Sequence, residues 1–195
     1  MTQSLLLIFV KNPELGKVKT RLAATIGGQQ ALDIYIQLLE KTRALTLPLK
    51  CDKMVYYASE IQRNDLWDEA RYQKARQGEG DLGERMRQAF DEGFAQGYQR
   101  ICIIGSDCYE LTTNILRRAF ASLENYDLVI GPSTDGGYYL LGMREPHPEL
   151  FRDKHWSTPS VSKETLEEAE RARLRWYTLP TLTDIDEEQD LKTMQ

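Results

Sequence analysis

Short apolar runs alternate with longer amphipathic stretches along the whole chain, and this alternation constrains the fold more than any other feature. Residues 5–10 form a continuous apolar run with a β-branched end, which is typical of a buried parallel strand. Similar runs predict further strands at residues 53–58, 100–105, 127–131, 138–143 and 175–179. The chain is therefore expected to build a sheet from short strands rather than a bundle of helices.

Amphipathic stretches with apolar residues at helical spacing lie between the predicted strands. They cover residues 31–45, 82–94 and 115–123. Thr112 or Thr113 is expected to cap the third helix, and Thr158-Pro159 predicts the N-cap and first turn of a fourth helix that ends near residue 173. Strands separated by such helices predict βαβ units. We therefore expect an α/β fold, a three-layer α/β/α sandwich with a mainly parallel sheet, formed by residues 1–195 as one domain.

The composition and the chain start argue against several classes of protein. Lys and Arg number 25 against 30 Asp and Glu, and this net charge of −5 argues against a protein that coats nucleic acid. The longest apolar run has six residues, whereas a membrane-spanning helix needs roughly 20. The first four residues lack the positive charge of a secretory signal. Cys51, Cys102 and Cys108 show no CxxC spacing, so we expect a cytoplasmic protein with reduced thiols.

The segment after the first strand is basic. Ligands bind beyond the carboxyl ends of the strands in a parallel sheet, so this segment is a candidate functional segment. It carries Lys11, Lys17, Lys19 and Arg21, with a turn at Gly16. Backbone N–H groups of a glycine turn, together with Lys and Arg side chains, can hold a phosphate, which predicts a small anionic ligand. The spacing of a Walker A loop is absent, and a solvated charged loop is the alternative.

Two further segments carry carboxylates that suit a divalent cation. Asp107 follows the strand predicted at residues 100–105, and Mg²⁺ prefers one or two carboxylates combined with phosphate oxygens. Asp184 and Asp186 alternate, so they lie on the same side of an extended segment. A turn or cap is the alternative for Asp107. The alternative for Asp184 and Asp186 is N-capping of a helix in the acidic stretch 187–191. One of these two carboxylates could also cap the helix while the other binds the metal.

Asp135, Gly136 and Gly137 follow the strand predicted at residues 127–131, and Tyr138 comes next. Two consecutive glycines allow a ligand to approach the backbone closely. The tyrosine could then stack on a sugar or a base. A tight turn with tyrosines packed in the core is the alternative.

Gly80 precedes the amphipathic helix predicted at residues 82–94, and Gly83 lies in its first turn. Free backbone N–H groups at the start of a helix can face an anion, which makes this segment a second candidate for binding phosphate. Capping of the helix by Asp81 is the equally favoured alternative.

Taken together, these segments resemble those of the DUF2064 family, which is often labelled as glycosyltransferase or selenodomain-associated transferase. The matching motifs are GKVKTRLA, DLGERM, IIGSDCYEL, GPSTDGGYYLLGM, WSTP and TDIDEEQDL, in order, over residues 5–191. Two positions depart from the family pattern. Tyr109 stands where proline is usual, and Glu187-Glu188 stands where a Thr-Pro pair is usual.

The resemblance implies a GT-A fold, that of nucleotide-diphospho-sugar transferases, with distant similarity to guanylyltransferases that activate phospholactate. It implies that Asp107 is the main ligand of Mg²⁺ or Mn²⁺ and Asp186 a possible second, while His155 stays open as a third. Asp135 is the candidate catalytic base. The resemblance places Lys11, Lys17, Lys19 and Arg21 on the nucleotide, and Asp135, Gly136 and Gly137 facing the acceptor or transferred group. From the segments themselves we add Gly16, Gly80, Gly83 and Arg85 as candidates for the nucleotide and Tyr138 as a candidate for the acceptor.

The sequence therefore predicts a metal-dependent transferase with a nucleotide or nucleotide-sugar donor and a small-molecule acceptor. Glycosyl transfer is favoured, chiefly because the family carries that label. The first alternative is a nucleotidyltransferase that activates a small phosphorylated acid or alcohol and releases pyrophosphate. The second is a catalytically silent nucleotide-binding module. The sequence leaves the oligomeric state open.

Overall fold

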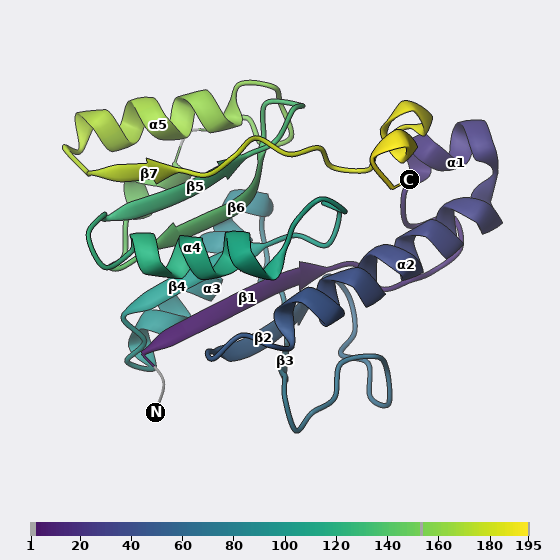
Figure 1. The fold of residues 1–195 in the computed structure, drawn as a ribbon, viewed down its shortest axis with the longest axis horizontal. Coiled ribbons are helices and arrows are strands. Elements are labelled where there is room, and N and C mark those ends of the chain that lie inside the picture. The colour runs from purple at the N-terminus through teal and green to yellow at the C-terminus, as the bar shows by residue number, and fades with distance from the viewer. Residues whose placement is uncertain (1–2, 153, 195) are drawn as a thin grey trace.

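The computed structural model describes residues 3–152 and 154–194 of the chain. Within these residues, seven strands form one sheet in the order β3-β2-β1-β4-β6-β5-β7 (Figure 1). The strands are β1 (Ser4–Val10), β2 (Asp52–Tyr57), β3 (Gln73–Arg76), β4 (Arg100–Ile104), β5 (Leu128–Pro132), β6 (Tyr138–Met143) and β7 (Trp176–Thr178). The helices are α1 (Thr20–Ile26), α2 (Gly28–Thr46), α3 (Leu82–Ala95), α4 (Thr113–Ser122) and α5 (Val161–Arg171), with 3-10 helices η1 (Pro148–Phe151) and η2 (Glu188–Met194).

Most strand pairings in this sheet are parallel. β1 pairs in parallel with β2 and β4, β2 with β3, and β5 with β7. β6 runs antiparallel to β4 and β5. Only residues 133–137 connect β5 to β6, and so short a connection cannot make the crossover that parallel strands need. The predicted α/β fold with a mainly parallel sheet is confirmed.

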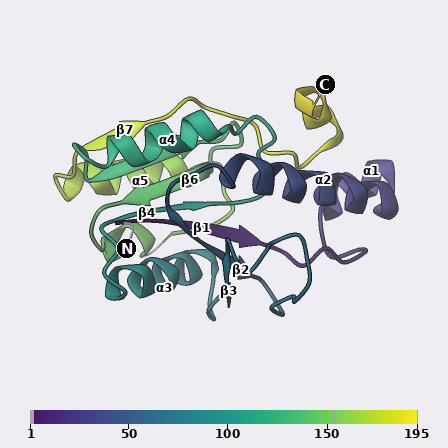
Figure 2. The same ribbon diagram turned by 60° about the horizontal axis from the view of Figure 1, so that its bottom comes forward.

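The two faces of the sheet bury separate sets of side chains. Leu6 and Ile8 of β1 pack on the face covered by α2 and α4, whereas Leu5 and Leu7 pack on the face covered by α3 and α5. Figure 2 shows α2 and α4 on one side of the sheet and α3 on the other. Successive side chains of a strand point to opposite faces, so a strand that is apolar at every position must be covered on both. The predicted three-layer α/β/α arrangement follows from this coverage.

Among the strands and α-helices of the described residues, β3 and α1 were not predicted from the sequence pattern. β3 consists of Gln, Lys, Ala and Arg at the edge of the sheet, where all four residues are exposed or half-buried. Such an edge strand needs no apolar alternation. α1 has seven residues, of which Leu22 is buried. One buried residue is too few to mark an amphipathic helix.

The start predicted for α5 is wrong. The helix begins at Val161 behind Ser160, not behind Thr158, and it ends at Arg171, close to the predicted end. The Thr158 hydroxyl donates a hydrogen bond to the His155 carbonyl at 2.8 Å. This hydroxyl therefore closes a turn before the helix instead of capping its first N–H groups.

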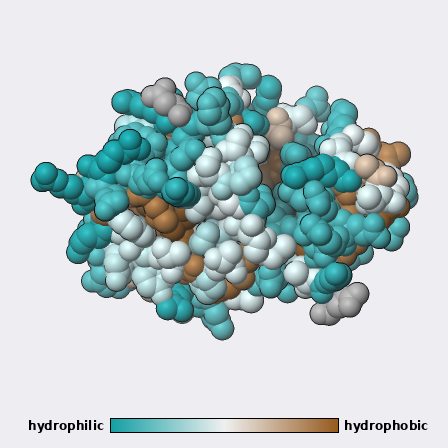
Figure 3. All heavy atoms as spheres, turned by 90° about the horizontal axis from the view of Figure 1, so that it is seen from above, coloured by the Kyte–Doolittle hydropathy of each residue, from teal (hydrophilic) through white to brown (hydrophobic). Residues whose placement is uncertain are grey.

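The surface of the described residues carries few large hydrophobic side chains. Those most exposed are Leu15, Ile36, Leu47 and Ile61. Figure 3 shows one face of the molecule, on which the hydrophobic areas are separated by hydrophilic ones. Within the described ranges, no helix is both long and apolar enough to cross a bilayer.

Asp127 fixes the edge strand β7, because its Oδ2 accepts hydrogen bonds from the Arg175 backbone N–H at 2.9 Å and from Arg175 Nε at 3.4 Å. Burial alone would raise the pKa of Asp127, but these hydrogen bonds outweigh it and lower the pKa below 3.8. A carboxylate with a lowered pKa stabilises the folded state at neutral pH, and this contribution disappears as the pH falls through that pKa. We expect Asp127→Asn to lower the free energy of unfolding by about 1 kcal/mol at neutral pH.

Urea unfolding at several pH values measures this contribution. The difference between wild type and Asp127→Asn is expected to shrink as the pH falls below 3.8, the ordinary value for this carboxyl. A difference that stays constant down to the lowest pH at which both proteins fold would contradict the assignment.

Candidate functional site

Three segments that are distant in the sequence meet at the carboxyl ends of β1 and β4. These strands are parallel neighbours, so the segments that follow them, residues 11–19 and 105–108, lie on the same edge of the sheet. The C-terminal segment returns to this edge, where the Ile185 backbone N–H donates to the Asp107 carbonyl at 2.9 Å and Asp184 forms a bridge with Cys108. In Figure 1 this yellow segment reaches α1.

The Lys19 cluster, which we define as Lys19, Arg21, Asp107 and Asp186, is the centre of this site. Nζ of Lys19 lies 2.7 Å from Oδ1 of Asp107 and 3.2 Å from Oδ1 of Asp186. Nη2 of Arg21 lies 2.8 Å from Oδ2 of Asp186. Two of the four predicted phosphate-binding cations, Lys19 and Arg21, are thus in direct contact with the predicted metal carboxylates.

Lys19 is held by an unusual backbone conformation. It precedes α1 with φ 48° and ψ 44°, in the left-handed region that a non-glycine residue rarely adopts. Burial alone would lower the pKa of its ammonium, but the negative charges of Asp107 and Asp186 outweigh burial and raise the pKa. The buried side chain therefore stays charged.

Asp184 lies beside this cluster and is half-buried. Burial raises its pKa to about 7. The carboxylates of Asp107, Asp135 and Asp186 add to this rise, and the ammonium of Lys19 opposes it. Asp184 therefore exchanges its proton near neutral pH, unlike a carboxylate on the surface.

Neither Asp184 nor Asp186 has the capping role that was the alternative for this segment. The backbone N–H groups of Asp186 and Glu187 donate to Oδ2 of Asp190, at 3.0 and 2.7 Å. Asp190 therefore serves the start of η2. The side chain of Asp186 contacts Lys19 and Arg21 instead of capping the helix.

The other predicted cations lie on the loop after β1. Nζ of Lys17 is exposed and lies 2.6 Å from Oε2 of Glu14. This hydrogen bond raises the pKa of Lys17. Lys11 is also exposed, and Gly16 adopts a φ of 76° in the turn between them. The loop therefore presents cations to solvent beside the Lys19 cluster, and their binding to phosphate stays a prediction.

Tyr35 of α2 connects the two loops that carry the site. Its hydroxyl donates to the Lys11 carbonyl at 3.0 Å and accepts from the Lys11 N–H at 2.8 Å. A longer hydrogen bond of 3.4 Å joins it to Ser106. Burial raises the pKa of Tyr35, so the hydroxyl stays protonated. The sequence marked Tyr35 only as part of the apolar face of a helix.

Tyr35→Phe is expected to lower the free energy of unfolding by about 1–3 kcal/mol, because it leaves both backbone groups of Lys11 without their partner in a partly buried place. Chemical denaturation measures this change. Tyr139→Phe is the matched control, since the Tyr139 hydroxyl makes one hydrogen bond, to the Pro180 carbonyl at 2.9 Å. Equal losses in the two variants would contradict the connecting role of Tyr35.

The turn between β5 and β6 holds Asp135 at its tip. Oδ1 of Asp135 accepts hydrogen bonds from the Ser133 hydroxyl at 2.5 Å and from the Gly137 N–H at 2.9 Å. Gly136 has a φ of 90° and contacts α5, since its carbonyl accepts from the Ser162 N–H at 2.9 Å. These two hydrogen bonds fix the orientation of Asp135. Its negative charge contributes to the raised pKa of Asp184.

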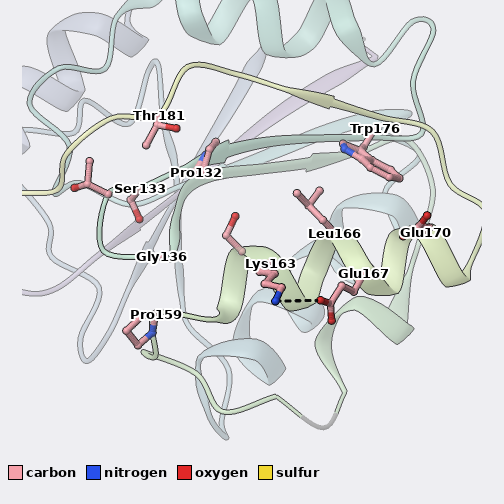
Figure 4. Close-up of a pocket in the computed structure, with 12 residues that line it drawn as sticks. Pro132, Ser133, Gly136, Pro159, Lys163, Leu166, Glu167, Glu170, Trp176 and Thr181 are labelled. Atoms are coloured by element: carbon pink, nitrogen blue, oxygen red, sulfur yellow. Dashed lines mark ion pairs between the residues drawn. The ribbon is translucent and has the colours of Figure 1, made fainter.

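Gly136 and Tyr138, both predicted to face the acceptor, lie in different surroundings in the structure. A groove of about 700 Å³ runs along α5 beside the β5–β6 turn, with Gly136, Leu166 and Trp176 among its lining residues (Figure 4). Tyr138 is half-buried and packs against the core beneath α3, where its hydroxyl contacts Sδ of Met86 at 4.0 Å. Stacking of Tyr138 on a ligand stays untested, whereas its packing is observed.

The segment before α3 has a structural role. Asp81 caps α3 by accepting from the Glu84 N–H at 2.9 Å, and Oε2 of Glu84 accepts a hydrogen bond from the Asp81 N–H in return. A side chain on Gly83 would overlap the ring of Trp156, so only glycine fits there. Arg85 donates to Oε1 of Gln77 at 3.1 Å. The capping alternative is confirmed, and nucleotide binding by Gly80, Gly83 and Arg85 stays a prediction.

The residues present fit a hard divalent cation through two carboxylates. Within residues 3–152 and 154–194, no three His, Cys, Asp or Glu side chains converge closely enough to hold a metal ion. Asp107 and Asp186 nevertheless share one cation, the ammonium of Lys19. Mg²⁺ commonly takes one or two carboxylates and completes its shell with phosphate oxygens and water. His155 is exposed, and its place in such a shell stays open.

Comparison with known proteins identifies one family and many related structures. Residues 42–158 match a family described as "Uncharacterized protein conserved in bacteria (DUF2064)". No curated protein matches the sequence. A protein from Desulfovibrio desulfuricans G20, proposed to be a nucleotide-diphospho-sugar transferase, is 35% identical with a TM-score of 0.91, covering 100% of this chain and 87% of the other.

More distant structures share the fold. The inositol-1-phosphate CTP transferase from T. maritima has a TM-score of 0.59 at 12% identity, covering 96% of this chain and 91% of its own. Rv0371C from Mycobacterium tuberculosis H37Rv, in complex with manganese, has a TM-score of 0.56 at 11% identity, covering 99% and 98%. At these identities the likeness establishes the fold alone.

Proposed function

This chain belongs to the DUF2064 family, and on that premise we propose that it is a transferase that uses a nucleotide or nucleotide-sugar donor and requires a divalent metal. The observation that carries the proposal is the Lys19 cluster, in which two cations contact Asp107 and Asp186 at the carboxyl edge of a parallel sheet. The relative from Desulfovibrio desulfuricans, proposed to be a nucleotide-diphospho-sugar transferase, supports the same class. We also propose that residues 1–195 form one domain.

The chemistry assigned to each residue follows from charge. Transfer from a nucleotide donor develops negative charge on the phosphate oxygens of the leaving group. Lys11, Lys17 and Arg21 would bind these oxygens, and Mg²⁺ or Mn²⁺ held by Asp107 and Asp186 would neutralise them further. Asp135, fixed by its two hydrogen bonds, would accept the proton of the attacking acceptor hydroxyl.

Glycosyl transfer is the leading form of this reaction. The 35% identical relative is proposed to be a nucleotide-diphospho-sugar transferase. When a nucleotide-diphospho-sugar donates its sugar, the nucleoside diphosphate is the leaving group. Nucleotidyl transfer to a small phosphorylated acid or alcohol is the second candidate. The cations of the loop after β1 favour it, since in-line transfer from a triphosphate needs several positive charges on the phosphates.

Product analysis distinguishes the two reactions. The protein is incubated with Mn²⁺ and either UDP- and GDP-sugars or the common nucleoside triphosphates, each with a panel of phosphorylated and hydroxylated acceptors. Release of nucleoside diphosphate that depends on the acceptor supports glycosyl transfer. Release of pyrophosphate with formation of a nucleotide-linked product overturns glycosyl transfer and supports the second candidate.

A further inference from the structure

Lys19 lies between the two carboxylates that the proposed function assigns to a divalent cation. Its Nζ is 2.7 Å from Oδ1 of Asp107 and 3.2 Å from Oδ1 of Asp186. Only 4% of the Lys19 side chain is exposed, against 42% of the Asp107 side chain and 30% of the Asp186 side chain. The ammonium therefore contacts the carboxylates from their buried side, and both carboxylates keep a side that faces solvent.

The surrounding contacts show that this arrangement is built into the fold. Arg21 binds the second oxygen of Asp186, so that carboxylate is already shared by two cations. Ile185 is fully buried next to it and fixes the C-terminal segment against α1 and α2. Lys19 adopts a left-handed backbone conformation that is rare for a residue with a side chain. These three constraints place one ammonium where two carboxylates converge.

We infer that Lys19 is a resident counter-ion, which holds Asp107 and Asp186 together in the metal-free protein and competes with a divalent cation for them. The inference rests on the proposed function, because it takes both carboxylates as metal ligands. A divalent cation and an ammonium in contact with the same two carboxylates repel each other. The cation therefore binds well only when the ammonium moves to another anion.

A phosphate of the donor is the anion that suits this exchange. When the donor binds on the adjacent basic loop, its phosphate oxygens can accept the Lys19 ammonium and release the carboxylates for the metal. The donor then raises the affinity for the metal, and by linkage the metal raises the affinity for the donor to the same extent. Lys19 would thus limit metal binding until the donor is present.

Binding of Mn²⁺ to the full chain without any nucleotide tests this competition. Isothermal titration and the electron paramagnetic resonance signal of free Mn²⁺ both report the affinity. Lys19→Met removes the competing charge, so we expect this variant to bind Mn²⁺ at least about tenfold more tightly than wild type. Lys19→Arg keeps the charge and is expected to bind Mn²⁺ as weakly as wild type.

A second neutral variant and a second measurement keep the test decisive if Lys19→Met does not fold. Lys19→Gln keeps hydrogen-bond donors between the carboxylates and is also expected to bind Mn²⁺ more tightly than wild type. Thermal unfolding shows whether each variant is folded. Mn²⁺ is expected to raise the Tm of both neutral variants by more than it raises the Tm of wild type.

Lys74→Met is the matched control. Nζ of Lys74 lies 2.8 Å from Oδ1 of Asp65, and 7% of its side chain is exposed, so this pair resembles Lys19–Asp107 but lies away from the site. We expect Lys74→Met to leave the affinity for Mn²⁺ at the wild-type value. A rise in this control equal to that of Lys19→Met would overturn the inference, because the effect would then be general electrostatics.

Two outcomes separate this inference from the proposed function. If folded Lys19→Met and Lys19→Gln bind Mn²⁺ no more tightly than wild type, while Asp107→Asn loses binding, Lys19 is not a competitor but the metal site stands. If wild type and both neutral variants bind no Mn²⁺, the counter-ion inference and the metal dependence both fail.

Discussion

Asp107→Asn is expected to lower the rate of transfer by about a hundred- to a thousandfold, the cost typical of removing one group that stabilises developing charge. The substitution removes the negative charge but keeps an oxygen that can contact Nζ of Lys19. The backbone of this residue is unaffected, so its carbonyl continues to accept from the Ile185 N–H. The protein should therefore stay folded while it loses metal-dependent activity.

Product release in the presence of Mn²⁺ measures this effect, with thermal unfolding as the test of the fold. Asp52→Asn is the control, because Asp52 stands at the amino end of β2 and accepts from the Tyr98 hydroxyl at 2.9 Å. It is expected to keep wild-type activity. An Asp107→Asn protein that is as active as this control would show that the assignment of Asp107 is wrong.

Gly136→Ala is expected to destabilise the protein by roughly 2–5 kcal/mol, the sum of backbone strain and overpacking. Gly136 has a φ of 90°, which residues with a side chain rarely adopt. A Cβ at this position would also overlap the Pro159 carbonyl oxygen, which belongs to the backbone and cannot move alone. The turn would shift away from α5 and take Asp135 with it, so activity is expected to fall as well.

Gly97→Ala separates the two causes. Gly97 has a φ of 92°, close to that of Gly136, but a Cβ there meets no atom within 4 Å. We expect it to cost only the strain of the left-handed conformation, about 1–2 kcal/mol. Chemical denaturation of both variants gives the comparison. Equal losses would mean that contact with Pro159 does not constrain the turn.

The parts of the fold that bury apolar side chains were predictable from the sequence. Residues 5–10 are apolar at every position because β1 is covered on both faces, and the alternation of strands and helices follows the layers. β3 and α1 were not predictable, because an exposed edge strand and a seven-residue helix bury too little to impose a period. The start of α5 was missed because Thr158 uses its hydroxyl in a turn.

Part of the site was predictable as well. The rule that ligands bind beyond the carboxyl ends of parallel strands pointed to the segments of Lys19 and Asp107, which the structure brings into contact. The sequence contained no signal that Asp184 is half-buried beside other carboxylates, since that follows from the return of the C-terminal segment. Nor did it show that Tyr35 joins two loops, because an aromatic residue on an apolar helix face usually indicates packing alone.

The return of the C-terminal segment to β1 and β4 has a consequence for synthesis of the protein. Lys19 leaves the ribosome long before Asp186, one of its two carboxylate partners, which lies 167 residues further along the chain. Contacts between such distant residues form late, because a long chain must close on itself first. The nascent chain therefore cannot complete the Lys19 cluster until residue 186 has been made, and a truncated product that lacks residues 184–194 could not assemble it.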